Sequence, residues 1–328
     1  MTDAGPADGI DIDQAVEDHR RELTGFCYRM LGSGSEAEDA VQETLVRAWR
    51  AAEGFEGRSS VRTWLFRIAH NVCVDMVRSP QRRALPVELG PSQHAADVVL
   101  GEPMAPGAWV EPVRDDRVLT ATLDPAELAA ERDSVRLAFV AALQHLPARQ
   151  RSALILCDVL RWPATEAAAA LDTTVASINS GLQRARATLS ERRGAPLDDV
   201  ADATSQMLLE RYVDAFQRYD MAALVALMRD DIVLSMPPFD VWLQGPDELV
   251  AWFTGQGAGC EGSRLIAVEL SGGAGFASYK PAGPGVWAPF ALQVIEVRGG
   301  LLAGHHNYLY PDRFAEFGLP TELRADPS

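Results

Sequence analysis

The chain has 328 residues, of which 47% are hydrophobic and 23% charged, a composition that is ordinary for globular proteins and a length that predicts more than one domain. Its formal net charge of −16 argues against a protein that holds nucleic acid through overall electrostatic attraction. No apolar run reaches the roughly 18 residues that a membrane span needs, and the acidic N-terminus lacks the features of a signal peptide. We therefore expect a cytoplasmic protein without membrane contact.

The four cysteines lie far apart and form no CxxC pair, which indicates core thiols and predicts neither a metal site nor a cofactor.

Composition divides the chain into three folded parts, at about 13–80, 131–193 and 204–320. Residues 81–130 carry six prolines and scattered acidic residues without a sustained hydrophobic period, which predicts a flexible acidic linker. A shorter hinge lies near 192–204. Of the three folded parts, only 131–193 is net positive, and it is therefore the part in which contact with nucleic acid is expected.

The first part, residues 13–80, predicts an amphipathic helical bundle. The stretches EDAVQETLVRAWRAA and SSVRTWLFRIAHNVCVDMVRS both repeat apolar residues at helical spacing, with charged residues on the opposite face. Ser59 or Ser60 is the expected N-cap of the second helix. The apolar positions of the first stretch, all expected in the core, are Ala40, Val41, Leu45, Ala48 and Trp49. By itself this pattern also fits an ordinary solvated face over a core.

The second part predicts a helix-turn-helix. An Ala-rich helix, a break at Asp172 to Thr174 and a second helix follow one another within ATEAAAALDTTVASINSGLQRARATL. The break often holds glycine, but aspartate also tolerates the left-handed conformation. Val175, Ile178, Leu182, Ala185 and Leu189 are expected to face the core. The opposite face carries hydroxyl, amide and guanidinium groups that suit base edges and phosphates, namely Ser177, Asn179, Ser180, Gln183, Arg184 and Arg186.

These motifs together resemble the sigma-70 family of the extracytoplasmic function type. AEDAVQETLVRAW is similar to region 2.2, SSVRTWLFRIAHNVCVDMVRS to regions 2.3 and 2.4, and LPARQRSALILCDVLRWPATEAAAALDTTVASINSGLQRARATL to region 4. The resemblance covers about residues 13–193 and implies two all-α domains, a region 2 helical bundle and a region 4 helix-turn-helix.

The resemblance also implies partners, which are core RNA polymerase, through its β′ clamp and β flap, and promoter DNA. The positions that match the polymerase-binding motif are Asp39, Gln42, Glu43 and Leu45. The candidates for the −10 element, which is captured as it melts, are Arg62, Trp64, Asn71, Asp75 and Arg78, although Trp64 equally fits a core position. The six exposed residues of the second helix-turn-helix helix become the candidates for the −35 element. Gly181 departs from the family pattern, because many relatives carry a basic residue there.

The third part combines helices with strand-like runs, which predicts an α+β domain. It resembles the SnoaL-like cone, a curved sheet wrapped on helices, and SMPPFDVWLQGPDELVAWF and RFAEFGLP carry this resemblance. Trp242, Trp287 and His305 are the pocket candidates. We favour the alternative in which the aromatic residues form the core and the pair His305 and His306 has one ring buried and one exposed. No acid–base pair is identifiable from spacing, so catalysis is not expected.

The sequence thus predicts a sigma factor that binds core RNA polymerase and directs promoter-specific initiation, with the C-terminal domain as an intramolecular regulator. An anti-sigma protein and a small-molecule ligand of that domain stay open as further partners. Two alternatives remain, a free-standing helix-turn-helix regulator with an effector pocket and a SnoaL-type isomerase or hydrolase. Neither of these gives the helices of residues 13–80 a role.

Overall fold

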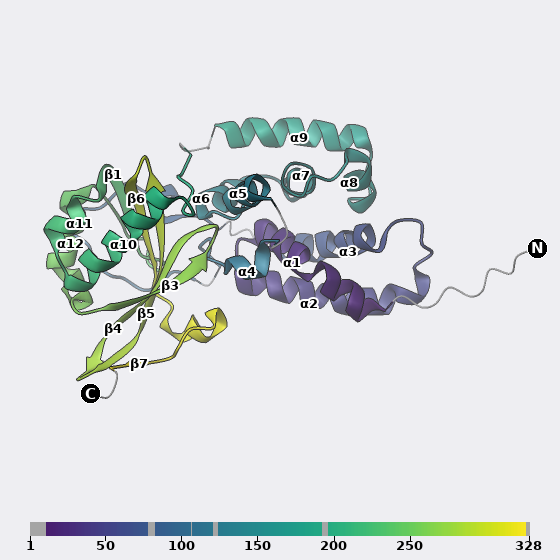
Figure 1. Ribbon diagram of the computed structural model, residues 1–328. Helices are drawn as coiled ribbons and strands as arrows, with labels where there is room; N and C mark the ends of the chain where they lie inside the picture. The colour runs from purple at the N-terminus through teal and green to yellow at the C-terminus, as the bar shows by residue number, and fades with distance from the viewer. Residues whose placement is uncertain (1–10, 78–82, 106, 121–123, 192–195, 326–328) are drawn as a thin grey trace, which may run out of the picture. The chain divides into compact units, whose positions relative to one another are not determined.

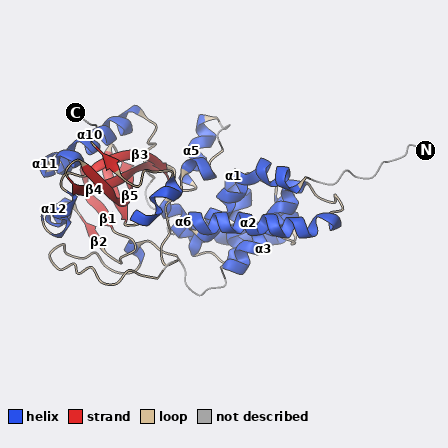
Figure 2. Cartoon of the chain, turned by 90° about the horizontal axis from the view of Figure 1, so that it is seen from below, coloured by secondary structure: helices blue, strands red, loops and turns tan. Residues whose placement is uncertain are grey.

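The computed structural model describes residues 11–77, 83–105, 107–120, 124–191 and 196–325 (Figure 1). Contacts divide the chain into two compact units. Unit 1 comprises Met1–Arg82, Asp116–Ser134 and Ala142–Arg193, and unit 2 comprises Arg83–Asp115, Val135–Ala141 and Gly194–Ser328. The folded core of unit 1 is helical, whereas the strands belong to unit 2 (Figure 2). Two all-α segments followed by an α+β domain confirm the expected fold class. Within the described ranges, no helix has the length and apolar character needed to cross a bilayer.

Unit 1 begins with a bundle of three long helices. Their bounds are α1 Ile12–Leu31, α2 Gly34–Ala51 and α3 Val61–Met76, with the short helix η1 Ala52–Gly54 after α2. The sequence fixes where they start, because Asp11, Ser33 and Ser60 accept hydrogen bonds from the first-turn amides of α1, α2 and α3. Ser60 is therefore the N-cap of α3.

The apolar faces of these three helices form the core of the bundle, in which Phe26 and Phe66 meet edge to face at 5.4 Å between ring centroids. One expected core residue lies elsewhere. Trp49 is 57% exposed, and its indole N–H donates to Asp13 Oδ1 at 3.3 Å. Asp13 lies in the first turn of α1, so Trp49 bonds to the edge of the bundle with its ring largely in solvent, and the expectation of a core position was wrong.

The second half of unit 1 contains the helix-turn-helix. Its elements are α4 Asp115–Val118, α5 Pro125–Asp133, α6 Leu137–Gln144, α7 Ala148–Leu154, the π-helical turn η3 Ile155–Val159, α8 Ala164–Ala170 and α9 Val175–Ser190; the first residue of α4 and most of α6 belong to unit 2. Asp172 has φ 47°, the left-handed conformation expected at the turn, and Thr174 caps α9. Ile178, Leu182, Ala185 and Leu189 are buried as expected, but Val175, the first residue of α9, is 37% exposed, so the expectation that it faces the core was wrong.

Residues 13–80 and 131–193, which the sequence treats as separate domains, pack against each other inside unit 1. The buried Arg151 donates to the Met30 backbone carbonyl and to Oε1 of Gln144, and His70 Nδ1 lies 2.8 Å from Ser152 Oγ. Burial lowers the pKa of His70 to about 4, with the charge of Arg149 adding to the effect.

Unit 2 is a sheet partly wrapped around helices. Its elements are η2 Pro86–Glu88, α10 Ala203–Arg218, α11 Met221–Val225, β1 Met228–Ser235, β2 Trp242–Gln244, α12 Pro246–Thr254, η4 Gln256–Cys260, β3 Arg264–Leu270, β4 Gly273–Gly283, β5 Val286–Arg298, β6 Leu301–Tyr308, η5 Pro311–Phe317 and β7 Leu323–Arg324. The strand order is β2-β1-β6-β5-β4-β3, with β7 paired to β5. Only the β1–β6 pair is parallel among the strand pairs of the described residues.

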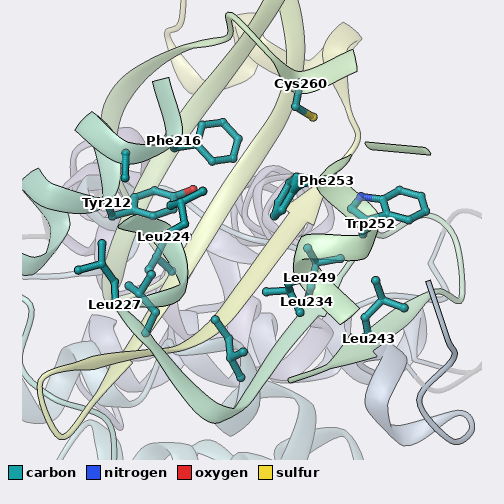
Figure 3. Close-up of a cluster of buried hydrophobic side chains, with 14 of the residues drawn as sticks. Tyr212, Phe216, Leu224, Leu227, Leu234, Leu243, Leu249, Trp252, Phe253 and Cys260 are labelled. Carbon is teal, nitrogen blue, oxygen red and sulfur yellow. The ribbon is translucent and has the colours of Figure 1, made fainter. Parts of the chain in front are cut away.

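The interior of the cone is filled by large side chains. Tyr212 and Phe216 from α10 and Trp252 and Phe253 from α12 meet aliphatic residues of the strands and Cys260 (Figure 3). The α-helical spacing of Leu208, Tyr212 and Phe216 places them on the face of α10 that the sheet covers. These elements form one hydrophobic core.

The segment predicted as a flexible linker differs from that expectation over the described residues 83–105 and 107–115, because these residues belong to unit 2 with the C-terminal domain. Trp109 is buried and its indole N–H donates to the Pro238 carbonyl at 3.0 Å. The Tyr308 hydroxyl donates to the Val110 carbonyl at 2.9 Å. The prolines limit regular structure in this segment, and its buried apolar side chains, which include Ala95, Val98, Trp109 and Val113, pack within unit 2. We call residues 107–115 the strap.

Candidate functional site

The outer face of α9 presents the polar residues expected to contact DNA. All six candidates, Ser177, Asn179, Ser180, Gln183, Arg184 and Arg186, are exposed. Arg184 donates to Ser180 Oγ at 2.7 Å, which orients the guanidinium along the helix face. A Cβ atom added at Gly181 would meet nothing within 4 Å, so glycine is not required here by packing.

Arg186 has a partner within the protein. Its Nε and Nη2 atoms donate to the two carboxylate oxygens of Asp158 at 2.8 and 2.6 Å, and this pairing raises the pKa of Arg186. Asp158 lies in η3, so the ion pair ties α9 to the segment before α8. Arg186 is thus placed at the edge of the candidate surface with its charge largely compensated.

The candidate polymerase-binding residues lie on α2, on its exposed side or beside it. Asp39 and Gln42 are exposed, and Glu43 and Leu45 are half-buried. Val46 and Trp49 are exposed on the same face, since positions 39, 42, 46 and 49 follow the helical repeat. We call Asp39, Gln42, Val46 and Trp49 the α2 surface, an apolar patch beside polar groups. The spacing of 46 and 49 could have identified these two residues from the sequence.

The candidates on α3 do not lie together. Trp64, Asn71 and Asp75 share one face, where the Trp64 ring packs on Phe55 at 4.9 Å between centroids and Asp75 accepts from Arg47 at 3.0 Å. Asn71 and Asp75 are exposed. Arg62 lies on the opposite face, against region 4 residues, and Arg78 falls outside the described residues. Sequence reasoning did not find the partners of Arg62, because they come from distant parts of the chain.

The three pocket candidates of the C-terminal domain do not converge. The indole N–H of Trp242, on β2, donates to the Gly90 carbonyl at 3.0 Å, and that of Trp287, on β5, donates to the Gly262 carbonyl at 2.9 Å. His305, on β6, is buried inside the cone. The described residues also contain no group of three or more His, Cys, Asp or Glu side chains arranged to hold a metal ion.

His305 belongs to a buried polar network. The Tyr212 hydroxyl donates to Gln293 Oε1 at 2.8 Å and accepts from Nε2 of His305 at 3.1 Å. Burial lowers the pKa of His305 to about 3, and the neighbouring His306 contributes further. A neutral imidazole held among Phe216, Phe253 and Tyr212 stabilises the core.

His306 points to the other face of the sheet and is also buried, so the expectation that one ring of the pair is exposed was wrong. Its Nδ1 lies 2.8 Å from Ser235 Oγ and its Nε2 3.7 Å from Glu296. A Cβ at Gly304 would lie 2.8 Å from His306 Nε2, so glycine leaves room for this pair. Both rings are covered because chain segments pack on both faces of the sheet.

Comparison with known proteins gives three family matches, to Sigma-70 region 2 over residues 15–83, to Sigma-70 region 4 over residues 136–189 and to the SnoaL-like domain over residues 209–305. The ECF RNA polymerase sigma factor SigG of Mycobacterium tuberculosis is 42% identical over 319 residues, which cover 95% of this chain and 85% of the relative.

SigJ, another ECF RNA polymerase sigma factor of Mycobacterium tuberculosis, is 26% identical over 324 residues, 94% of this chain and 95% of the relative. Its crystal structure superimposes with a TM-score of 0.60 and 22% identity, over 94% of this chain and 100% of that chain. At this identity the superposition establishes the fold.

Proposed function

Because this chain belongs to the ECF RNA polymerase sigma factors, we propose that it directs core RNA polymerase to promoters through −10 and −35 contacts, with its C-terminal domain as an intramolecular regulator. The observation that carries the proposal is the exposed polar face of α9 on a helix-turn-helix, where Asn179, Gln183 and Arg184 are free to reach base edges in the major groove. This role belongs to the cytoplasm, where the polymerase transcribes.

The α2 surface is the proposed docking site for the β′ clamp. Two exposed apolar side chains, Val46 and Trp49, flanked by Asp39 and Gln42, have the composition of an interface core with a polar rim. Leu45 and Glu43 border it. The β flap is the second proposed contact of the polymerase, on region 4.

Melting of the −10 element is assigned to the face of α3 that carries Trp64, Asn71 and Asp75. An aromatic ring supports stacking of an unpaired base, and amide and carboxylate groups can read its edge. Trp64 rests on Phe55, which lies at the end of η1 and precedes the loop that leads to α3. Ring and loop together are suited to hold a flipped base.

The strap supports the regulatory part of the proposal. Ser271 and Gly272 adopt left-handed conformations, which turn their amides toward the strap: the Ser271 amide donates to the Val113 carbonyl at 2.8 Å and the Gly272 amide to Asp115 Oδ1 at 2.7 Å. Because a chain spans at most about 3.5 Å per residue, fixing part of the segment between regions 2 and 4 shortens their reach. We propose that the C-terminal domain restrains initiation in this way.

Neither alternative function gains support. A free-standing regulator leaves the α2 surface without a role. A SnoaL-type enzyme requires polar groups that line an accessible cavity, whereas Trp242 and Trp287 lie apart and the polar groups that meet His305 are buried. A separate anti-sigma protein is compatible with the exposed surfaces of unit 1.

The test is run-off transcription from genomic fragments with core polymerase and the full chain. New start sites are expected with the wild type and are expected to be lost in the Asn179→Ala, Arg184→Ala double variant. Arg211→Ala, an equal charge loss on the exposed face of α10, is the control and should retain them. Absence of any added start site with the wild type, together with operator binding by the free chain, would contradict the proposal in favour of the regulator.

A further inference from the structure

The turn between η3 and α8 holds an arginine in a conformation that favours glycine. Arg161 has φ 58°, in the left-handed region. The Leu160 amide donates to the Ile155 carbonyl and the Trp162 amide to the Leu156 carbonyl, both at 2.9 Å, and these bonds close the end of η3 around Arg161. Helices often end in this way with glycine at the left-handed position, because a Cβ atom is disfavoured there. A strained backbone around an exposed arginine points to a role for its side chain outside the fold.

The Arg161 guanidinium has no partner among the described residues, since no hydrogen bond, ion pair or aromatic contact engages its side chain there. The nearest acidic side chains along the chain are Asp158 and Glu166, and both have other partners. Asp158 accepts from Arg186, and Glu166 accepts from Thr63 Oγ1 at 3.1 Å. An exposed guanidinium presents N–H donors in a planar fork that suits phosphate oxygens. Arg161 therefore keeps a charge that Arg186 shares with a carboxylate.

Arg161 lies close to the polar face of α9. Asn179, Gln183 and Arg186 follow one another at i, i+4 and i+7 and so share that face. The ion pair between Arg186 and Asp158, at 2.6 Å, joins this face to η3. Arg161 follows Asp158 by three residues, and three residues span at most about 11 Å. The Arg161 backbone is thus held near the end of the surface that is proposed to contact the −35 element.

The place of Arg161 in the helix-turn-helix indicates which part of the DNA it reaches. In complexes of this motif the first helix crosses the DNA backbone, while the second enters the major groove. Arg161 lies three residues before α8, the first helix, begins at Ala164. A cation at this position faces phosphates, which carry no sequence information but fix the register of the second helix on the duplex.

We propose that Arg161 binds a backbone phosphate at the edge of the −35 element and so contributes affinity for promoter DNA without reading its sequence. This inference rests on the proposed function and adds a positioning contact to it. The contact is made by the side chain of Arg161, and the left-handed turn holds that side chain outside the core of the motif.

The test separates the charge of Arg161 from its backbone strain. In holoenzyme formed from core polymerase and the full chain, Arg161→Gly is expected to weaken promoter binding by roughly five- to tenfold and to reduce the slope of log affinity against log salt by about one. Glycine relieves the left-handed strain, so the unfolding temperature of the free chain should equal or exceed that of the wild type. Weaker binding by a chain of undiminished stability excludes misfolding as the cause.

Two further variants serve as controls. Arg161→Lys keeps the charge at the same position and should keep a salt slope close to that of the wild type. Arg211→Ala removes an exposed charge from α10 and should change neither the affinity nor the slope.

Binding is measured on two duplex fragments of different sequence, each carrying a start site that the wild type adds in run-off transcription. Because the phosphates are the same in every sequence, Arg161→Gly should weaken binding to both fragments equally. An unchanged salt slope in folded Arg161→Gly, or a loss confined to one fragment, would overturn the phosphate contact. Failure of the wild type to add any start site would instead overturn the proposed function.

Discussion

Asp158 holds Arg186 through two hydrogen bonds, at 2.6 and 2.8 Å, and so pairs within the protein a cation that was expected to contact DNA. The Asp158→Ala variant should release this guanidinium toward a phosphate. We expect tighter binding to nonspecific duplex DNA at low salt and a slope of log affinity against log salt that is steeper by about one. Fluorescence anisotropy at several salt concentrations measures both. Glu191→Ala, an equal charge change at the end of α9, should leave the slope closer to that of the wild type.

Gly181 lies in the middle of α9 with open space around its Cβ position. Gly181→Ala should therefore raise the free energy of unfolding by about 0.5–1 kcal/mol, because alanine loses less backbone entropy in a helix. The control is Gly25→Ala in α1, where a Cβ would lie 2.9 Å from the Val118 carbonyl oxygen and 2.7 Å from Arg29 Nη1. That substitution should destabilise the protein. Thermal unfolding of both variants distinguishes the two cases, and equal effects would contradict the geometry.

Trp49 exposes 57% of its surface on α2 and donates a hydrogen bond to Asp13 of α1. Trp49→Ala should leave the unfolding temperature nearly unchanged but weaken binding to core polymerase by roughly 2 kcal/mol or more, the usual effect of truncating an aromatic hot spot. Met207 on α10 is equally exposed, at 57%, and Met207→Ala serves as the control for loss of apolar surface. Binding to immobilised core polymerase gives the comparison. Equal affinities for the two variants would remove Trp49 from the interface.

The low pKa of His305, about 3, makes the stability of unit 2 depend on pH. Above pH 6.5 the imidazole is neutral in both folded and unfolded chains, so its contribution is fully present. As pH falls from about 6.5 toward 3, only the unfolded chain takes up the proton, and stability should decrease by about 1.4 kcal/mol per pH unit. His305→Gln should flatten this dependence in urea unfolding between pH 7.5 and 5.

His94 provides the contrasting case. Its pKa is raised by the Glu248 carboxylate, so its contribution is present at low pH and is lost as pH rises through the folded-state pKa. His94→Gln should therefore not reduce the loss of stability in acid. If His305→Gln and His94→Gln both reduced the loss of stability at low pH, the burial of His305 would not be the cause of that loss.

The strap depends on the Asp115 carboxylate, which is 6% exposed and accepts from the Gly272 amide at 2.7 Å. Asp115→Ala leaves this amide without its acceptor and should destabilise unit 2 by about 1–3 kcal/mol. Hydrogen exchange at residues 107–115 should accelerate, and run-off at limiting core polymerase should rise if the strap restrains initiation. Asp312→Ala, at an exposed carboxylate of η5, is the control and should change none of these quantities.

Local chemistry in the sequence determined the elements and the nature of the α9 surface. Ser60 and Asp220 begin helices because their side chains accept first-turn amides, Asp172 makes the left-handed turn, and the helical repeat alone exposes Asn179, Gln183 and Arg184. The same repeat predicted a core position for Trp49, because the spacing of apolar residues does not show whether another segment of the chain covers them. The alternation along β6 could not predict that both faces of the sheet are covered.

Only the tertiary structure decided which charges are free. The resemblance to the sigma-70 family predicts that Arg62 and Arg186 contact DNA, yet each is paired within the protein, with Glu166 104 residues away and Asp158 28 residues away, beyond the reach of any local pattern. The strap arises in the same way, because the Trp109 indole is buried only when distant segments of unit 2 pack around it. Periodicity fixes which face of an element is apolar, whereas long-range packing determines what that face meets.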